Sequence, residues 1–144
     1  LVLAGMSGMS PNRHASDDDI RVTKTILEAM GSVVELGEEH MDAVTALSGS
    51  GPAYIFYLAE SMIDAGIKIG LDPDKAVTLT MKTMKGAIKL MEETEDSPET
   101  LRKKVASPGG TTEAAFKVLE KNSVKENFIE AIGAAAARSK ELSG

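Results

Sequence analysis

Apolar residues at helical spacing dominate the chain after residue 16. Ser16 precedes three aspartates, a pattern typical of a helix N-cap, and Gly31 stands where such a helix would end. The β-branched segment 32–36 predicts a brief strand that ends at Gly37. A short helix is predicted next, from Glu38 to about residue 47.

The most apolar helix is predicted over residues 53–69. Its charged residues Glu60, Asp64 and Lys68 are spaced by four, so they form one narrow stripe. A helix that is apolar over most of its circumference needs cover on several sides, and we expect a partner chain to supply it. The second long helix is predicted from Asp72-Pro73 to about residue 93. Its expected inward positions are Val77, Met81, Met84, Ile88 and Met91.

Three further helices are predicted in the last third of the chain. Ser97-Pro98 begins one that ends near Val105, and a second covers 111–121. Ser123 to Glu126 is a capping-box sequence and begins the last helix. Buried positions are expected at Ala115, Val118 and Leu119. From residue 38 onward the pattern therefore predicts an all-α domain.

Composition excludes several functions. The chain has 144 residues, with 16 Lys and Arg against 22 Asp and Glu, and its net charge is −6. It has no cysteine and two histidines, so we expect no metal site. An acidic chain with three Phe, two Tyr and no Trp lacks the basic surface and stacking rings of a nucleic-acid binder.

Targeting signals are also missing from the sequence. No apolar run reaches the roughly 18–20 residues that span a bilayer, so we expect no membrane partner. The opening residues 1–5 have neither an initiator Met nor a basic region, and are not a signal peptide. We expect a cytoplasmic chain that is cut out of something longer.

Two glycine-containing loops are candidate sites. Ser48–Tyr54 superficially suggests a dinucleotide-binding turn, but a helix precedes it where that motif needs a strand. We therefore reject a nucleotide site on this loop and leave a tight turn as its simplest interpretation. The second loop, Ser107-Pro-Gly-Gly-Thr-Thr112, lies between a basic helix end and a new helix. Its N–H groups suit a carboxylate or phosphate, although a helix cap with a glycine turn explains it equally well.

These loops carry a family resemblance. The blocks Asp42–Tyr54 and Val105–Thr112, in this order and at this separation, resemble pyrroline-5-carboxylate reductase. The resemblance runs from Gly5 through Leu142. It implies an oxidoreductase of proline biosynthesis, which reduces Δ1-pyrroline-5-carboxylate to L-proline with NADPH or NADH.

The resemblance also implies an architecture. Residues 1–16 correspond to the last strands of a Rossmann domain that is otherwise absent, and 17–144 to the helical dimerisation and substrate-binding domain. The implied fold is a helical bundle of the 6-phosphogluconate dehydrogenase C-terminal-like type, which forms an intertwined homodimer and sometimes a higher oligomer. Without the dinucleotide domain, this chain alone is expected to bind no cofactor and to be inactive.

Site residues follow from the resemblance, position by position. Thr112 falls on the position that donates a hydrogen bond to the imine nitrogen, and is the implied catalytic residue. Glu38 falls on a substrate-binding position, and Lys104 on one that contacts substrate or cofactor. The remaining implied substrate-binding residues are Ser107, Gly109, Gly110 and Thr111.

Two alternatives stay open. The chain could be a structural oligomerisation module that binds no ligand. It could also be the C-terminal domain of another Rossmann dehydrogenase, such as a 3-hydroxy acid dehydrogenase, although the Ser107–Thr112 block argues against this. Glu95 and Asp96 are expected to form a solvated loop.

Overall fold

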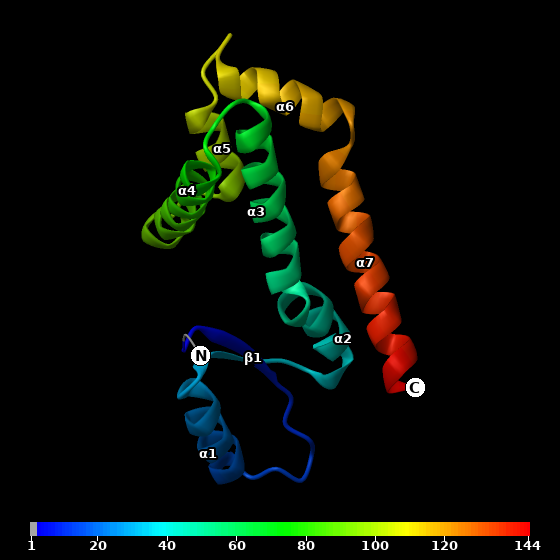
Figure 1. Ribbon diagram of the computed structural model, residues 1–144. Coiled ribbons are helices and arrows are strands. Elements are labelled where there is room, and N and C mark those ends of the chain that lie inside the picture. Colours follow the sequence, from blue (N-terminus) through cyan, green and yellow to red (C-terminus); the bar gives the residue numbers. More distant parts are fainter. Residues whose placement is uncertain (1–2) are drawn as a thin grey trace. The chain divides into compact units, whose positions relative to one another are not determined.

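A computed structural model describes residues 3–144 (Figure 1). The chain divides into two compact units, residues 3–52 with Glu130–Gly144, and Ala53–Ile129. The elements in chain order are β1 (Gly5–Met9), α1 (Asp17–Glu28), β2 (Gly31–Glu35), η1 (Glu38–His40), α2 (Met41–Val44), η2 (Thr45–Gly49), α3 (Gly51–Lys68), α4 (Pro73–Glu93), α5 (Pro98–Val105), α6 (Thr111–Lys121) and α7 (Val124–Ser143).

The first unit begins with a strand–helix–strand crossover. β1 and β2 pair in parallel, in a register that runs from Gly5 opposite Gly31 to Met9 opposite Glu35. The crossover helix α1 begins with a complete capping box, in which the Ser16 hydroxyl and the Asp19 carboxylate satisfy each other's backbone N–H groups. The predicted N-cap and the predicted strand are therefore both confirmed.

The helix expected over 38–47 is present but irregular. A 3₁₀ turn leads into α2, which widens at once into the π-helical turn η2. The Ser50 N–H closes this turn by donating to the Thr45 carbonyl at 2.8 Å. Ala46 lies within it and is buried.

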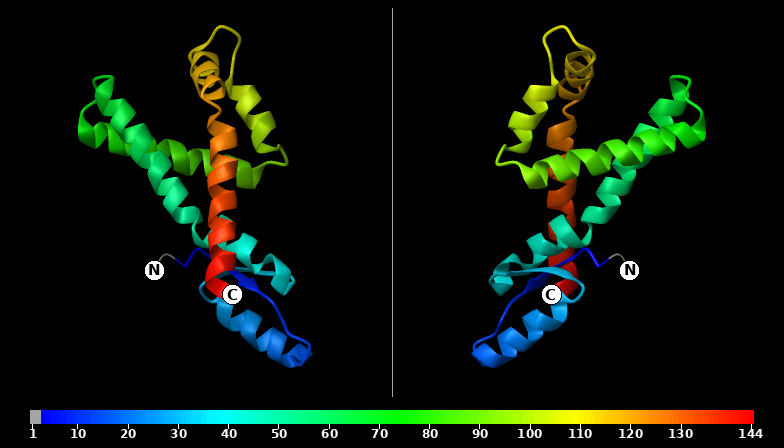
Figure 2. Two further views of the ribbon diagram at one scale, coloured as in Figure 1. Left: turned by 90° about the vertical axis from the view of Figure 1, so that its right-hand side faces the viewer. Right: turned by 90° about the vertical axis from the view of Figure 1, so that its left-hand side faces the viewer.

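In the second unit, α3 and α4 form a splayed hairpin. Gly70 ends α3 with a φ of 103°, a conformation that suits glycine, and Asp72 caps α4 as predicted. Gly66 and Ala76 pack closely beside the turn, where a Cβ on Gly66 would come within 3.2 Å of the Ala76 Cβ. Away from the turn the two helices separate, as Figure 2 shows.

This separation leaves most apolar side chains of the hairpin uncovered. On α3, Phe56 is 71% exposed and Tyr57 68% exposed. The inward positions expected on α4 were wrong for the single chain, because most of these side chains are open to solvent within residues 3–144. Val77, Met81, Ile88 and Met91 are exposed and Met84 is half-buried. The buried residues of α4 are instead Ala76 and Thr80.

The last helices show the same openness. α6 and α7 begin where predicted, but the burial expected on α6 was wrong, since these positions are open to solvent in the part of the chain that the structure describes. Ala115, Val118 and Leu119 are all exposed. The capping box expected at Ser123 was also wrong, because its φ of 51° is left-handed rather than extended. Among the described residues, no helix combines the length and apolarity needed to span a bilayer.

Candidate functional site

The glycine–threonine loop connects α5 to α6 within the second unit. Two contacts of Arg102 hold these helices together. Its guanidinium lies 4.8 Å from the centre of the Phe116 ring, and its Nη1 lies 3.5 Å from a carboxylate oxygen of Glu120. The two helices that flank the loop are therefore connected to each other by side-chain contacts of Arg102.

The structure explains why each of the two loop positions is a glycine. Gly109 has a φ of 72°, in the left-handed region where a side chain is strained. Gly110 is the N-cap of α6, and a Cβ there would come within 2.8 Å of Ser107 Oγ. Its N–H donates to the Ser107 carbonyl at 3.0 Å, which closes the turn. Larger residues at either position would change the path of the loop.

The first turn of α6 presents free donors. Within the described chain, the backbone N–H groups of Thr111, Thr112 and Glu113 have no acceptor, as is normal at the start of a helix. The Thr112 side chain is half-buried, and its hydroxyl makes no hydrogen bond with any residue of 3–144. Because the positive end of the helix dipole lies here, the arrangement favours an anion beside Thr112.

Two ion pairs flank the loop. Lys104 Nζ lies 2.5 Å from the Asp96 carboxylate. Asp96 is half-buried in the loop between α4 and α5, whereas Glu95 in the same loop is exposed. Glu113 accepts a hydrogen bond from the Gly109 N–H and pairs with Lys117. Its pKa is held below the usual range, first by Lys117 and then by the Gly109 N–H.

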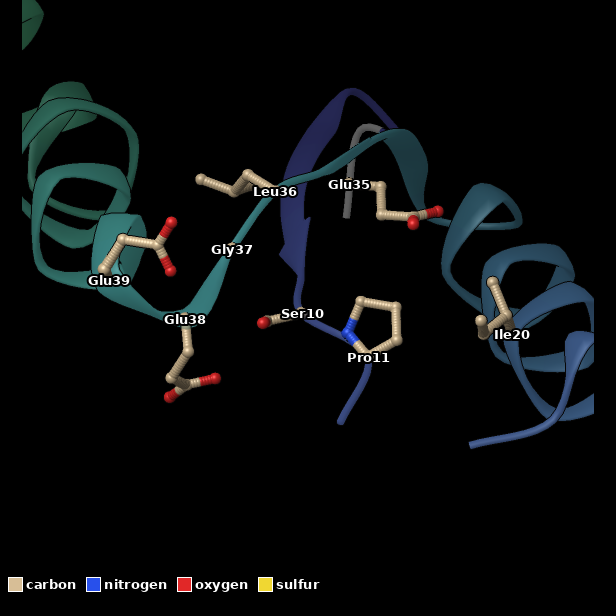
Figure 3. A pocket seen from close by; sticks show the side chains of 8 residues that line it. All are labelled: Ser10, Pro11, Ile20, Glu35, Leu36, Gly37, Glu38 and Glu39. Carbon is tan, nitrogen blue, oxygen red and sulfur yellow. The ribbon is translucent and has the colours of Figure 1, made fainter. Parts of the chain in front are cut away.

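Glu38 belongs to the other unit. It lines a pocket of about 590 Å³ beside the end of β1. Figure 3 shows Ser10 and Pro11 between Glu38 on one side and Ile20 of α1 on the other. Three carboxylates line this pocket, so its electrostatic character is negative. They belong to Glu35, Glu38 and Glu39.

Most of the site residues expected from the sequence are therefore in one place. Ser107, Gly109, Gly110, Thr111 and Thr112 form a single loop and helix start, and Lys104 lies on the preceding helix. Glu38 lies in the first unit, beside the end of β1.

Asp96 and Glu113 were not predicted from the sequence to be contacts of the site. A signal for Glu113 was present, because an acid at the third helical position often reaches back to a free N–H. No comparable local signal marks Asp96, whose partner lies eight residues away.

Neither the Ser48–Tyr54 segment nor the turn after β1 matches a dinucleotide-binding turn. The Ser48–Tyr54 segment lies across η2 and the start of α3, so a helical turn precedes it, as expected. β1 is followed by Ser10-Pro11 rather than by a glycine-rich turn, and these residues do not fit a dinucleotide pyrophosphate. Within residues 3–144, no group of three or more metal-ligating side chains is assembled.

The fold and the loop together define a mostly helical domain with a glycine–threonine turn before α6. The family model described as "Pyrroline-5-carboxylate reductase dimerisation" matches residues 38–142. The chain belongs to this family. Its helical architecture, with a short parallel strand pair, agrees with the fold expected from the sequence.

Relatives with this name are found across bacteria and eukaryotes. The pyrroline-5-carboxylate reductase of Synechocystis sp. is 44% identical over 96% of this chain, and pyrroline-5-carboxylate reductase 2 of Bacillus subtilis is 42% identical over 94%. The chain covers 52% and 49% of these proteins, so it spans about half of their length.

Solved structures agree with this assignment. The Coxiella burnetii reductase is 43% identical with a TM-score of 0.91, over 98% of this chain and 53% of that one. A Plasmodium falciparum pyrroline carboxylate reductase with NADP bound is 33% identical with a TM-score of 0.90, over 95% and 56%.

Proposed function

We propose that this chain is the dimerisation and substrate-binding part of a reductase that converts Δ1-pyrroline-5-carboxylate to L-proline. NADPH or NADH would supply the hydride in the complete enzyme, which would act in the cytoplasm. The observation that carries the proposal is the loop before α6, where three free N–H groups and the free Thr112 hydroxyl belong to one helix start.

The substrate carboxylate matches the backbone donors. In the proposed complex, its oxygens accept hydrogen bonds from the N–H groups of Thr111, Thr112 and Glu113, beside the positive end of the α6 dipole. The N–H groups of Gly109 and Gly110 already have acceptors within the chain, so the glycines would shape the turn and would not bind the ligand directly.

The imine nitrogen matches the Thr112 hydroxyl. As the C=N carbon gains hydride, electron density moves to the nitrogen, which takes up a proton. A hydroxyl that donates a hydrogen bond to this nitrogen stabilises the developing charge and lowers the barrier. Thr112 is suited to this role because its side chain is half-buried and next to the proposed carboxylate site.

Charged residues have supporting roles in this proposal. Lys104 would contact substrate or cofactor. Its ammonium group would then either leave the Asp96 carboxylate or contact both Asp96 and the ligand. Glu38 would contact substrate or cofactor from its own pocket in the first unit. Two copies of the chain would form a homodimer through the exposed apolar side chains of the helices. The match to a dimerisation family supports this part of the proposal.

Titration of L-proline into the 144-residue chain tests the proposal. We expect backbone amide shifts at residues 109–113 in NMR spectra, with smaller changes elsewhere. A Thr112→Ala variant should bind L-proline more weakly, whereas Thr100→Ala, on a neighbouring helix, should bind as the parent does. Unchanged amides at proline concentrations that saturate known reductases would favour an oligomerisation module without a ligand.

A further inference from the structure

A single carboxylate holds the glycine loop against α6. One oxygen of Glu113 accepts the Gly109 N–H at 2.7 Å, and the other lies 2.5 Å from Lys117 Nζ. Gly109 is the left-handed residue of the loop, and a Cβ there would meet nothing within 4 Å beyond its chain neighbours. Packing therefore does not restrict Gly109, and the Glu113 contact is what ties its N–H to the helix.

This contact determines which donors remain for a ligand. The Gly110 N–H donates to Ser107, and the Gly109 N–H to Glu113, so neither is available. The free donors are the three that follow, at the start of α6. Without an acceptor for the Gly109 N–H, a flexible glycine pair could reorient and present different donors to the same ligand.

We propose that Glu113 is a positioning residue of the substrate loop: it fixes Gly109 so that the Thr111 and Thr112 donors stay directed at the substrate carboxylate. The inference rests on the proposed function and extends it. Lys117 offsets the negative charge of Glu113, so the carboxylate can remain beside an anion site. The Glu113 side chain does not touch the substrate in this arrangement; only its backbone N–H is among the donors proposed for the substrate carboxylate.

The first experiment measures the loop without ligand. Glu113→Ala should raise the amide hydrogen-exchange rate of Gly109 by roughly tenfold or more, because the amide loses a charged acceptor. Glu113→Gln keeps an acceptor oxygen and should restore most of the protection. The matched control is Glu99→Ala on α5, because Glu99 pairs with Lys103 at 2.6 Å in the same way. Glu99 accepts no loop N–H among the described contacts, so this variant should leave Gly109 unchanged.

The second experiment measures the reaction in the complete reductase. Glu113→Ala should raise the KM for pyrroline-5-carboxylate by about tenfold and change kcat by less than about threefold, since binding rather than chemistry is affected. Glu113→Gln should recover most of the KM. Lys117→Met, which leaves the Gly109 contact in place, should have a smaller effect than Glu113→Ala.

Two results would overturn the inference. Unchanged Gly109 exchange in Glu113→Ala would show that the contact does not hold the loop. Faster exchange of the Gly109 amide with an unchanged KM would show that the contact stabilises the start of α6 but does not position the substrate. If the parent protein neither binds L-proline nor reduces pyrroline-5-carboxylate, the proposed function fails instead, and the Gly109 exchange still decides whether Glu113 holds the loop.

Discussion

The Asp42 carboxylate accepts a hydrogen bond from the Ser139 hydroxyl at 2.7 Å, although the two residues lie 97 positions apart in the chain. Both side chains are half-buried, and the bond connects α2 to the end of α7 inside the first unit. A second hydroxyl of α7, that of Ser143, lies 3.3 Å from the same Asp42 oxygen, so two serines of the C-terminal helix contact this carboxylate.

The loss of this bond should therefore destabilise the protein. We expect Ser139→Ala to lower the free energy of unfolding by about 1 kcal/mol, near the low end for a bond to a charged acceptor because the pair is partly solvated. Urea denaturation would measure it. Ser61→Ala is the control, since the Ser61 hydroxyl donates only within α3. Equal effects of the two variants would contradict a special role for the Asp42 contact.

Caps were predictable from the sequence because they depend on neighbours within three residues. Ser16, Asp72 and Ser97 all accept the expected backbone N–H, and each of their helices begins at the expected residue. The π-helical turn at Thr45–Gly49 was not predicted, since no local pattern separates it from an ordinary helix. The capping box predicted at Ser123 was wrong because Ser123 itself has a left-handed backbone conformation.

Burial was the least predictable property. Helical spacing identifies an apolar face, but it does not say which element covers that face or whether the cover comes from the same chain. Leu119 and Met81 illustrate this, since both have the expected spacing and both are exposed in the single chain. Similarly, the loop residues 107–112 were recognisable as a block, whereas the Glu113 contact depends on a side chain that folds back onto the loop.

The exposed face of α3 should be where two copies meet. Phe56 is 71% exposed and lines a shallow depression with Tyr57 and Ile63, which Glu60 and Asp64 also line. A charge in place of Phe56 would have to be buried in each subunit. We expect Phe56→Glu to weaken the dimer by about 3 kcal/mol or more, which is over a hundredfold in the dissociation constant.

Sedimentation equilibrium would measure this change. Thr23→Glu introduces the same charge at an exposed position of α1 and should leave the dimer intact. A Phe56→Glu protein that remains dimeric at the parent's concentration would place the interface elsewhere on the chain.

The capping box of α1 should respond to pH. Hydrogen bonds from the Ser16 hydroxyl and backbone N–H lower the pKa of the Asp19 carboxyl. A lowered pKa means that the stabilisation is fully present above the unfolded-state pKa, and that it is lost as the pH falls through the lower, folded-state pKa. We expect Ser16→Ala to raise the pKa of Asp19 toward its usual value.

Carbonyl-detected NMR of the Asp19 side chain between about pH 2 and 6 would follow this titration, a range chosen around the usual aspartate pKa of about 3.9. Ser32→Ala, in β2, is a control that should leave the Asp19 curve unchanged. An Asp19 pKa that is the same in the parent and in Ser16→Ala would contradict the capping contact as the cause of the shift.

Thr112 should matter for turnover more than for stability. Its hydroxyl has no partner within residues 3–144, so Thr112→Ala removes no hydrogen bond of the folded chain. We expect unfolding free energies within about 0.5 kcal/mol of the parent. In the complete reductase, kcat should fall by roughly 10²-fold or more if the hydroxyl supports charge at the imine nitrogen. Thr112→Ser keeps the hydroxyl and should retain most of the activity.

Gly110 gives an independent test of loop shape. A Cβ at this position would come within 2.8 Å of Ser107 Oγ and 3.0 Å of the Ser107 carbonyl oxygen, and the second of these is backbone and cannot move away easily. Gly110→Ala should therefore shift the start of α6 and weaken L-proline binding by roughly tenfold, the equivalent of one lost hydrogen bond. Titration calorimetry on the parent and the variant would measure the loss.

The control for Gly110 lies in the middle of α4. A Cβ on Gly86 would meet no other part of the described chain within 4 Å, and alanine is the better helix former, so Gly86→Ala should bind L-proline as the parent does. Its unfolding free energy should rise by up to about 1 kcal/mol. If Gly110→Ala binds L-proline normally, the close approach to Ser107 does not set the geometry of the site, and the carboxylate must be held by groups other than the first turn of α6.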